Sequence, residues 1–172
     1  MNSAQSGMAF DSSRLPEDPQ ALAELSAQFM YDKDQATQGL GISLTKVGPG
    51  RASMQMTVRP DMLNGHQTCH GGFIFALADS TFAFACNSRN QATVASGCTI
   101  DYLAPGLLGD VLTADALEAS LAGRTGVYDI LVTNQDGKRI ALFRGRSYRI
   151  KGVVVGETAC TNFESAAGEG NV

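Results

Sequence analysis

Apolar and polar residues along this 172-residue chain follow a helical period first and a strand period afterwards. From position 18 to about position 37, apolar residues recur three to four positions apart, at Leu22, Leu25, Phe29 and Met30. Asp18 and Pro19 open this segment, and Asp before Pro is a common helix start because the Asp side chain caps free amides. The pattern predicts one amphipathic helix that ends at Gly39 and Gly41.

The next segment alternates apolar and polar residues on both sides of Gly48-Pro49-Gly50. Apolar residues occupy every second position, first at Leu40, Ile42 and Leu44 and then at Ala52, Met54, Met56 and Val58. This period is typical of a strand with one buried face, and the Gly-Pro-Gly sequence is typical of a turn. The segment predicts an antiparallel hairpin.

The longest apolar run lies at residues 72–87, with the sequence GFIFALADSTFAFACN. Its length and its alanines favour a helix, about 24 Å long at 1.5 Å per residue, over a strand. A helix that is apolar on every side is surrounded by protein. We therefore expect this helix at the centre of the fold.

Four strand-length segments follow, at residues 92–105, 111–121, 125–134 and 139–150. Pro105-Gly106 and Ala122-Gly123 predict turns between them, and the sequence QDGK at 135–138 predicts a hairpin of the type I′ kind. We expect these four strands to form a meander, in which each strand pairs with its neighbour in sequence.

Two strands, one long buried helix and four further strands predict an α+β fold. Its simplest form is an antiparallel sheet of about six strands wrapped around one central helix, with an extra N-terminal helix. The corresponding division is an N-terminal extension and helix at 1–38, a main domain at 39–155 and a flexible tail at 156–172. Because one sheet cannot cover a helix that is apolar on every face, the packing also predicts a homodimer.

Charge and cysteine content narrow the class of protein. The net charge of −4 argues against nucleic acid as a partner, since phosphate contacts need clustered Lys and Arg. No run approaches the roughly 20 apolar residues that span a bilayer, and the N-terminus lacks the basic region and apolar run of a secretory signal. The cysteines show no paired spacing (Cys69, Cys86, Cys98 and Cys160). We therefore expect a cytoplasmic protein with reduced thiols and no membrane segment.

Residues 63–80, LNGHQTCHGGFIFALADS, contain several side chains that can act as metal ligands, nucleophiles, acids or bases. His66, Cys69, His70 and Cys86 could bind zinc, but H-x-x-C-H lacks the paired clamps of structural zinc sites. A Cys69 nucleophile with His70 as its base is also disfavoured, because neighbours in sequence usually point apart. We expect no metal and no cofactor.

Asp79 lies in the middle of the apolar run, where every neighbour is expected to be buried. A buried carboxylate without a partner is costly, and Asp is a weak helix former. The alternative is that Asp79 lies on one wet stripe of the helix with Ser80 and Thr81. The apolar context favours a carboxylate that faces a cleft and acts as base or nucleophile.

Gly71 and Gly72 precede the helix, and the first amides of a helix have no intrahelical acceptor. One interpretation of the two glycines is a simple helix-entry turn. The functional alternative is an oxyanion hole, in which a backbone N–H at the positive end of the helix polarises a carbonyl. Gly71 and Asp79 would then supply the electrophile activator and the base of an acyl-transfer site.

Three stretches of the chain together resemble the hotdog-fold acyl-CoA thioesterases, and in particular the phenylacetic-acid-degradation (PaaI-type) family. They are LNGHxxCHGG with the later Asp79, then CTIDYLAPGLLGDVLTADA, then TGVYDILVTNQDGKRIALFRG. The resemblance covers roughly residues 40–152. It implies hydrolysis of an acyl-CoA thioester to a carboxylate and free CoA, with CoA as part of the substrate.

The resemblance also implies roles for individual residues. Asp79 matches the catalytic acid, either general base or nucleophile, and Gly71 matches the glycine whose amide polarises the thioester carbonyl. Asn64, fifteen positions before Asp79, matches a polar residue that holds water or the leaving side of the substrate. His70 is expected to fix the loop, with a lesser catalytic part. In this family Asp79 would face Gly71 of the partner subunit, and two dimers commonly form a tetramer.

One position departs from the family pattern. Some relatives with Glu as the acid carry Thr or Ser one helical turn later, where this chain has Ala83. A hydroxyl that positions water is therefore not expected there. The shorter Asp79 also retracts the carboxylate by one methylene, so the choice between nucleophile and base stays open.

A basic segment near the end of the last strand is the candidate for the anionic half of CoA. The sequence FRGRSYRIKG contains four cations and no acid, and Arg144 and Arg146 are the expected phosphate contacts. A solvated edge strand is the alternative, because positive charges also protect strand edges.

The sequence thus predicts a homo-oligomeric acyl-CoA thioesterase, and the family suggests an aromatic, phenylacetyl-type acyl group. A hotdog enoyl-CoA hydratase or dehydratase is one alternative, although His70 directly before Gly71-Gly72 argues against it. A non-catalytic acyl-CoA-binding protein is the other.

Overall fold

The computed structural model describes residues 15–156 and consists of three α-helices, one short 3-10 helix and six strands within that range. In chain order the elements are α1 Pro19–Lys33, α2 Gln35–Gly39, β1 Ser43–Gly48, β2 Arg51–Thr57, η2 Pro60–Met62, α3 Gly71–Asn87, β3 Thr93–Tyr102, β4 Val111–Ala122, β5 Thr125–Thr133 and β6 Arg139–Arg149. The predicted tail lies, apart from Gly156, outside the described residues, as does most of the N-terminal lead-in. The domain boundaries themselves stay a prediction.

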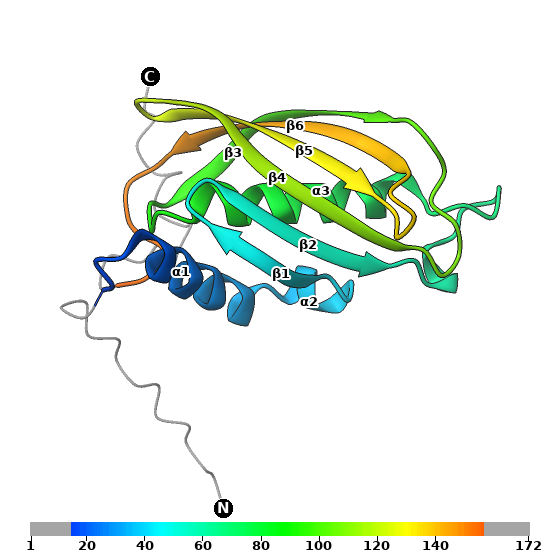
Figure 1. Ribbon diagram of the computed structural model, residues 1–172, viewed down its shortest axis with the longest axis horizontal. Helices are drawn as coiled ribbons and strands as arrows, with labels where there is room; N and C mark the ends of the chain where they lie inside the picture. The colour runs from blue at the N-terminus through cyan, green and yellow to red at the C-terminus, as the bar shows by residue number, and fades with distance from the viewer. Residues whose placement is uncertain (1–14, 157–172) are drawn as a thin grey trace, which may run out of the picture.

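A six-stranded antiparallel sheet curves around α3, and α1 with α2 lies at one side of that helix (Figure 1). Aromatic side chains join the helix to the sheet: Phe82 of α3 lies 5.4 Å from Tyr128 of β5 and 6.1 Å from Phe143 of β6, measured between ring centroids. This is the hotdog arrangement, and the predicted fold class is confirmed.

The strand order is β1-β2-β4-β5-β6-β3, so the predicted four-strand meander is wrong. Strand β3 lies at the far edge of the sheet and pairs with β6, while β4 pairs with β2. Loop length explains the difference, because hairpins form across connections of two to five residues. The β4–β5 and β5–β6 connections are that short, whereas residues 103–110 carry the chain from β3 back across the sheet to β4.

The type of the β5–β6 hairpin also differs from the prediction. A type I′ turn needs two consecutive residues with positive φ. Of the residues in the QDGK loop only Gly137 has one, at +76°. The Gly137 amide donates to the Asn134 carbonyl at 3.0 Å, which makes the loop a tight turn followed by a left-handed glycine.

The predicted N-terminal helix is two helices, because Asp34 interrupts it. Asp34 ends α1 and caps α2, where its carboxylate accepts the Thr37 amide at 2.9 Å and the Thr37 hydroxyl at 2.5 Å. Leu40 consequently caps α2, and β1 begins only at Ser43. The predicted cap by Asp18 is confirmed, since its carboxylate accepts the Ala21 amide at 2.9 Å.

Helix α3 is covered unevenly. The sheet packs on one side, and α1 and α2 pack on the flank nearest β1, where the Thr37 and Ser80 hydroxyls are 2.9 Å apart. Between Phe75, which packs on Phe143 of β6 beside β3, and Ser80, which contacts α2, one face of α3 carries small, partly exposed residues: Ala76, Asp79 and Ala83. Helix α3 therefore has an incompletely covered flank on the β3 side.

No helix among residues 15–156 is long and apolar enough to cross a membrane.

Candidate active site

The loop before α3 is held by Asn64. Its side-chain Oδ1 accepts the His66 amide at 2.8 Å and the Thr68 amide at 3.3 Å, and its Nδ2 donates to the Thr68 hydroxyl at 3.1 Å. Asn and Asp commonly fold loops in this way, by bonding to the backbone two residues on. In the single chain Asn64 therefore shapes the loop that precedes the helix.

His70 caps the helix. Its backbone is extended, and its Nδ1 accepts the Gly72 amide at 3.0 Å, while its own amide donates to the Met62 carbonyl at 2.8 Å. Because Nδ1 accepts a hydrogen bond, the neutral ring carries its proton on Nε2. These contacts join the loop to the first turn of α3.

Gly71 is the first residue of α3, and its amide N–H has no acceptor among residues 15–156. The His70 carbonyl of the same peptide group accepts the Phe73 amide at 2.9 Å, which polarises the Gly71 N–H further. The amide also lies at the positive end of a 17-residue helix. These are the properties of an oxyanion-hole donor.

Tyr102, at the end of β3, packs against Gly71, a contact that the sequence did not indicate. The Tyr102 hydroxyl donates to the Gly71 carbonyl at 2.9 Å. A Cβ atom at position 71 would lie 2.9 Å from the Tyr102 ring, so no larger residue fits without moving that ring. This close approach explains the glycine, and β3 reaches it only because the sheet order places that strand beside α3.

The Asp79 side chain is partly buried on the incompletely covered flank of α3, and its carboxylate accepts no hydrogen bond from residues 15–156. Burial raises the pKa of the Asp79 carboxyl above its usual range. A carboxylate that is desolvated and unpaired is more basic than one in water. The arrangement suits proton abstraction from water or direct attack on a carbonyl.

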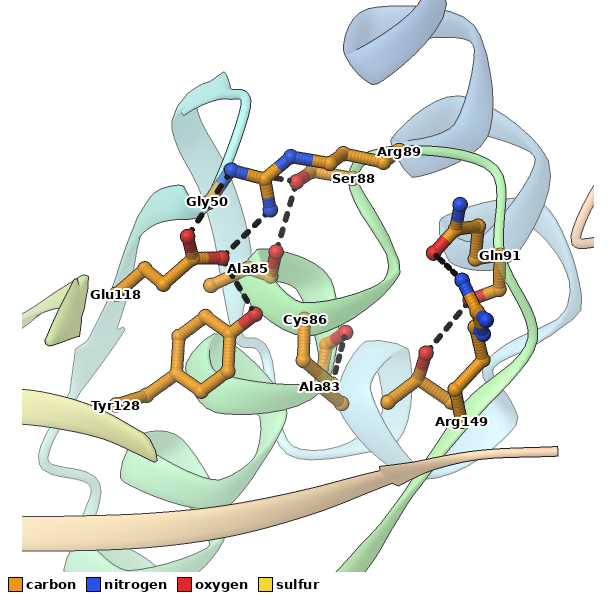
Figure 2. A network of polar contacts seen from close by, with 11 residues as sticks. Gly50, Ala83, Ala85, Cys86, Ser88, Arg89, Gln91, Glu118, Tyr128 and Arg149 are labelled. Atoms are coloured by element: carbon orange, nitrogen blue, oxygen red, sulfur yellow. Dashed lines mark hydrogen bonds and ion pairs between the residues drawn. The ribbon is translucent and has the colours of Figure 1, made fainter. Parts of the chain in front are cut away.

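The C-terminal end of α3 is fixed by a polar network that crosses from the helix to the sheet (Figure 2). Arg89 forms two hydrogen bonds with Glu118 of β4, at 2.6 and 3.1 Å, and the Tyr128 hydroxyl donates to the same carboxylate at 2.8 Å. The Gly50 amide in the β1–β2 turn donates to the Ser88 hydroxyl at 2.8 Å. These contacts fix the C-terminal end of α3, the helix that carries Asp79, to the sheet.

Three cysteines of the described chain are free thiols, and two of them, Cys69 and Cys86, are buried. Burial raises the pKa of Cys69 to about 11 and that of Cys86 to about 12, so neither is a thiolate at neutral pH. Among residues 15–156 no group of three His, Cys, Asp or Glu side chains could hold a metal ion. Cys160 lies outside the described residues.

Replacing Cys69 with alanine is expected to leave kcat within about twofold of the wild-type value, because the thiol is not the nucleophile. The buried Cys69 side chain is small, so the lost packing should cost no more than about 1 kcal/mol of unfolding free energy. Thiol release measured with both proteins checks this. A loss of a hundredfold or more would show that Cys69 takes part in the reaction.

Arg144 and Arg146 point away from α3. Phe143, their neighbour in β6, packs on Phe75 of the helix with 5.4 Å between ring centroids, and side chains alternate in face along a strand. Arg144 is exposed and forms a bidentate ion pair with Asp129, at 2.6 and 2.9 Å. Its guanidinium holds the pKa of the Asp129 carboxyl below the usual range. Arg144 and Arg146 therefore lie on the opposite face of the sheet from α3 and Asp79.

A hotdog sheet around a helix with a free first amide and an unpaired, half-buried acid defines a class of thioester-processing enzymes. Comparison with known proteins agrees. The family model of the thioesterase superfamily matches residues 66–141. The chain is 52% identical, over 77% of its length and 94% of the relative, to the acyl-coenzyme A thioesterase PaaI of Escherichia coli K12.

Solved structures show the same likeness. The structure of the E. coli PaaI protein from the phenylacetic acid degradation operon matches with a TM-score of 0.78 and 50% identity, covering 79% of this chain and 99% of that one. A Streptococcus mutans protein bound to acetyl CoA matches with a TM-score of 0.61 and 28% identity, over 63% of this chain and 88% of that one. The chain belongs to the thioesterase superfamily, among its PaaI-type members, and is a thioester hydrolase.

Proposed function

We propose that this enzyme is a cytoplasmic acyl-CoA thioesterase that hydrolyses aromatic, phenylacetyl-type acyl-CoA to the free acid and CoA. The unpaired Asp79 carboxylate on α3 is the observation that carries the reaction type. The similarity to the E. coli acyl-coenzyme A thioesterase supports the CoA ester, and the operon of that relative supports the phenylacetyl group.

Two routes use the same residues. In the first, Asp79 takes a proton from water, the hydroxide adds to the thioester carbonyl, and the Gly71 amide stabilises the oxyanion until the C–S bond breaks. In the second, the Asp79 carboxylate itself attacks, the thiolate of CoA leaves, and water hydrolyses the mixed anhydride. In both routes the thiolate takes up one proton, and the products are a carboxylic acid and CoA.

Asn64 and His70 act around these two groups. We assign to Asn64 a polar contact with the water or the sulfur side of the substrate, and to His70 the support of the Gly71 amide through the helix cap. Of the two candidate phosphate contacts, Arg146 is the better one, because Arg144 is already paired with Asp129.

The site requires two chains. Gly71 and Asp79 are eight residues apart on one helix, which separates them by about 12 Å along its axis. The Gly71 N–H also points toward the N-terminal end of α3, away from Asp79. One carbonyl cannot reach both groups in a single chain. We infer that Asp79 works with Gly71 of the partner subunit.

The single chain offers a matching surface for that partner. Strand β3 is a ten-residue edge strand with no Lys, Arg or Pro, and such an edge is a template for pairing with another chain. The incompletely covered flank of α3, with Ala76, Asp79 and Ala83, lies on the same side. A two-fold homodimer along β3 and α3 covers both, and we propose that two such dimers form a tetramer.

Mixed dimers test the shared site. Chains with Asp79→Asn and chains with Gly71→Pro are each expected to be nearly inactive alone. Refolded together, they should recover roughly a quarter of wild-type turnover, because half of the dimers are mixed and each mixed dimer keeps one intact site of two. Thiol release before and after mixing measures this. If mixing restores nothing although an affinity tag on one chain co-purifies the other, both groups of a site come from one chain.

Thiol release measured over a panel of acyl-CoA thioesters tests the activity itself. Phenylacetyl-CoA is expected to give the highest kcat/KM, with slower hydrolysis of acetyl-CoA and long-chain esters. Absence of thiol release, together with a change in absorbance of an enoyl-CoA, would indicate a hydratase. Binding without either change would indicate a non-catalytic acyl-CoA-binding protein.

A further inference from the structure

The backbone that leads to Gly71 is held by two hydrogen bonds from different segments. The Cys69 amide donates to the Gly106 carbonyl of the β3–β4 connection at 2.9 Å. The His70 amide donates to the Met62 carbonyl of η2 at 2.8 Å. Cys69 is 4% exposed, so the first of these bonds is shielded from water. The direction of the next amide, that of Gly71, therefore depends on where Gly106 and Met62 lie.

The position of Gly106 depends on the side chain of Asp110. Asp110 is only 7% exposed, and its carboxylate accepts the Leu107 amide at 2.8 Å and a Gln135 side-chain N–H at 2.9 Å. Burial alone would raise the pKa of the Asp110 carboxyl, but these hydrogen bonds hold the pKa below its usual range. The ionised side chain thus closes the turn that directly follows Gly106, since the Asp110 amide also donates to the Leu107 carbonyl at 3.0 Å.

The position of Met62 depends on the backbone around Asp110. The Asp110 carbonyl accepts the Val58 amide, and the Gly109 amide donates to the Val58 carbonyl, both at 2.9 Å. Val58 leads into η2, which ends at Met62, the acceptor for the His70 amide. The two segments that hold the backbone before Gly71 therefore meet at one buried residue, Asp110.

We propose that Asp110 is a positioning residue for the oxyanion hole, an inference that rests on the proposed thioesterase function. Asp110 acts on the Gly71 amide through the two carbonyls that fix Cys69 and His70. An oxyanion donor must lie about 2.7–3.1 Å from the oxygen of the transition state. A small shift of the backbone therefore weakens transition-state stabilisation while it leaves binding of the substrate nearly unchanged.

Asp110→Ala is expected to lower kcat about tenfold and to change KM less than about twofold, measured by thiol release. Asp110→Asn keeps an oxygen that can accept the Leu107 amide, so its kcat should stay within about threefold of wild type. Asn90→Ala is the matched control, because the buried Asn90 Oδ1 also accepts a backbone amide, that of Val155 at 2.7 Å, beyond the C-terminal end of α3. Both alanine variants should lower the Tm, but Asn90→Ala should leave kcat within about twofold of wild type. A loss in Asp110→Ala that falls on KM instead of kcat would overturn the inference.

A double-mutant cycle identifies the group through which Asp110 acts. In the Gly71→Pro protein no N–H remains to be misplaced, so adding Asp110→Ala should lower kcat by less than a further factor of about two. In the Asp79→Asn protein the full loss of about tenfold should remain, because the residual reaction still uses the Gly71 amide. Equal losses in the wild-type, Gly71→Pro and Asp79→Asn backgrounds would contradict a role through that amide.

Amide hydrogen exchange, followed by NMR, provides a readout that does not require turnover. In Asp110→Ala the Cys69 and His70 amides should exchange at least about tenfold faster than in wild type. The Thr93 amide is the internal reference for global unfolding, since it donates to the Asn87 side chain at 2.9 Å, beyond the C-terminal end of α3. Unchanged exchange at Cys69 and His70 would overturn the inference. The expected exchange, together with a wild-type protein that releases no thiol from any acyl-CoA, would support the link from Asp110 and refute the proposed function alone.

Discussion

Replacing Asp79 with asparagine is expected to lower kcat/KM about a thousandfold, within the range that a general base contributes. Asparagine has the same shape as aspartate but cannot accept a proton or attack a carbonyl. The side chain lies on α3 without a hydrogen-bond partner among residues 15–156, so the substitution removes no contact of the single chain. Thiol release from phenylacetyl-CoA measures the loss.

The same substitution should stabilise the protein at neutral pH. Burial raises the pKa of the Asp79 carboxyl in the folded state, so the folded protein binds that proton more tightly than the unfolded chain. Stability therefore falls as pH rises from the ordinary carboxyl pKa through the raised folded pKa, and the cost persists at higher pH. Removing that cost should raise the Tm above that of wild type at neutral pH, and differential scanning calorimetry measures the difference.

Two further measurements complete this prediction. In wild type, kcat/KM should fall with acidification around a midpoint above the ordinary Asp pKa of about 3.9, and the residual rate of Asp79→Asn should lack that midpoint. Ser80→Ala is a matched control, because Ser80 is the next residue on α3 but faces Thr37. An Asp79→Asn protein with near-wild-type turnover of every thioester would show that the Asp79 carboxylate is neither the base nor the nucleophile.

Replacing Gly71 with proline is expected to lower kcat about a hundredfold to a thousandfold, the usual effect of losing one oxyanion donor. Proline deletes the N–H of residue 71 and little else of the backbone. It is favoured at the first position of a helix, and His70 before it is already extended, at φ −61° and ψ 133°, as a residue before proline must be. The helix should therefore still form, and its circular dichroism checks this.

Gly71→Ala separates the amide from the steric effect. Alanine places the same Cβ against the Tyr102 ring, at 2.9 Å, but keeps the N–H. Its kcat should fall much less than that of Gly71→Pro, by about tenfold or less, because the ring can rotate away at a modest cost. Equal losses in the two variants would mean that the packing of Gly71 against Tyr102, and not its amide, is what the reaction needs.

The sequence predicts the secondary-structure elements correctly where a hydrophobic period or a turn residue is unambiguous. The apolar run at 72–87 is α3 to within one residue, and the Gly48-Pro49-Gly50 turn joins β1 to β2. It failed where local and long-range preferences compete. The helix predicted from the apolar period at 22–30 extended through Asp34. The Asp34 carboxylate instead accepts the Thr37 amide and starts a new helix.

The candidate site shows the same division. The motif around Gly71 and the apolar surroundings of Asp79 could be recognised in the sequence, because both depend only on residues a few positions away. The unpaired state of both groups required the structure, as did the position of Tyr102 on Gly71. Arg144 and Arg146 carried a charge signal, but their side of the sheet follows from the alternation along β6 and its packing on α3.

By itself the sequence determined the central helix, most of the strands and the candidate reacting groups, because periodicity, caps and turns depend on residues a few positions apart. The tertiary structure decided the order of the strands, the packing of Tyr102 against Gly71 and the flank of α3 that carries Asp79. These depend on which distant segments pack together. Because β3 pairs with β6 and not with β4, that edge strand and that flank lie on the side where the proposed partner completes the site.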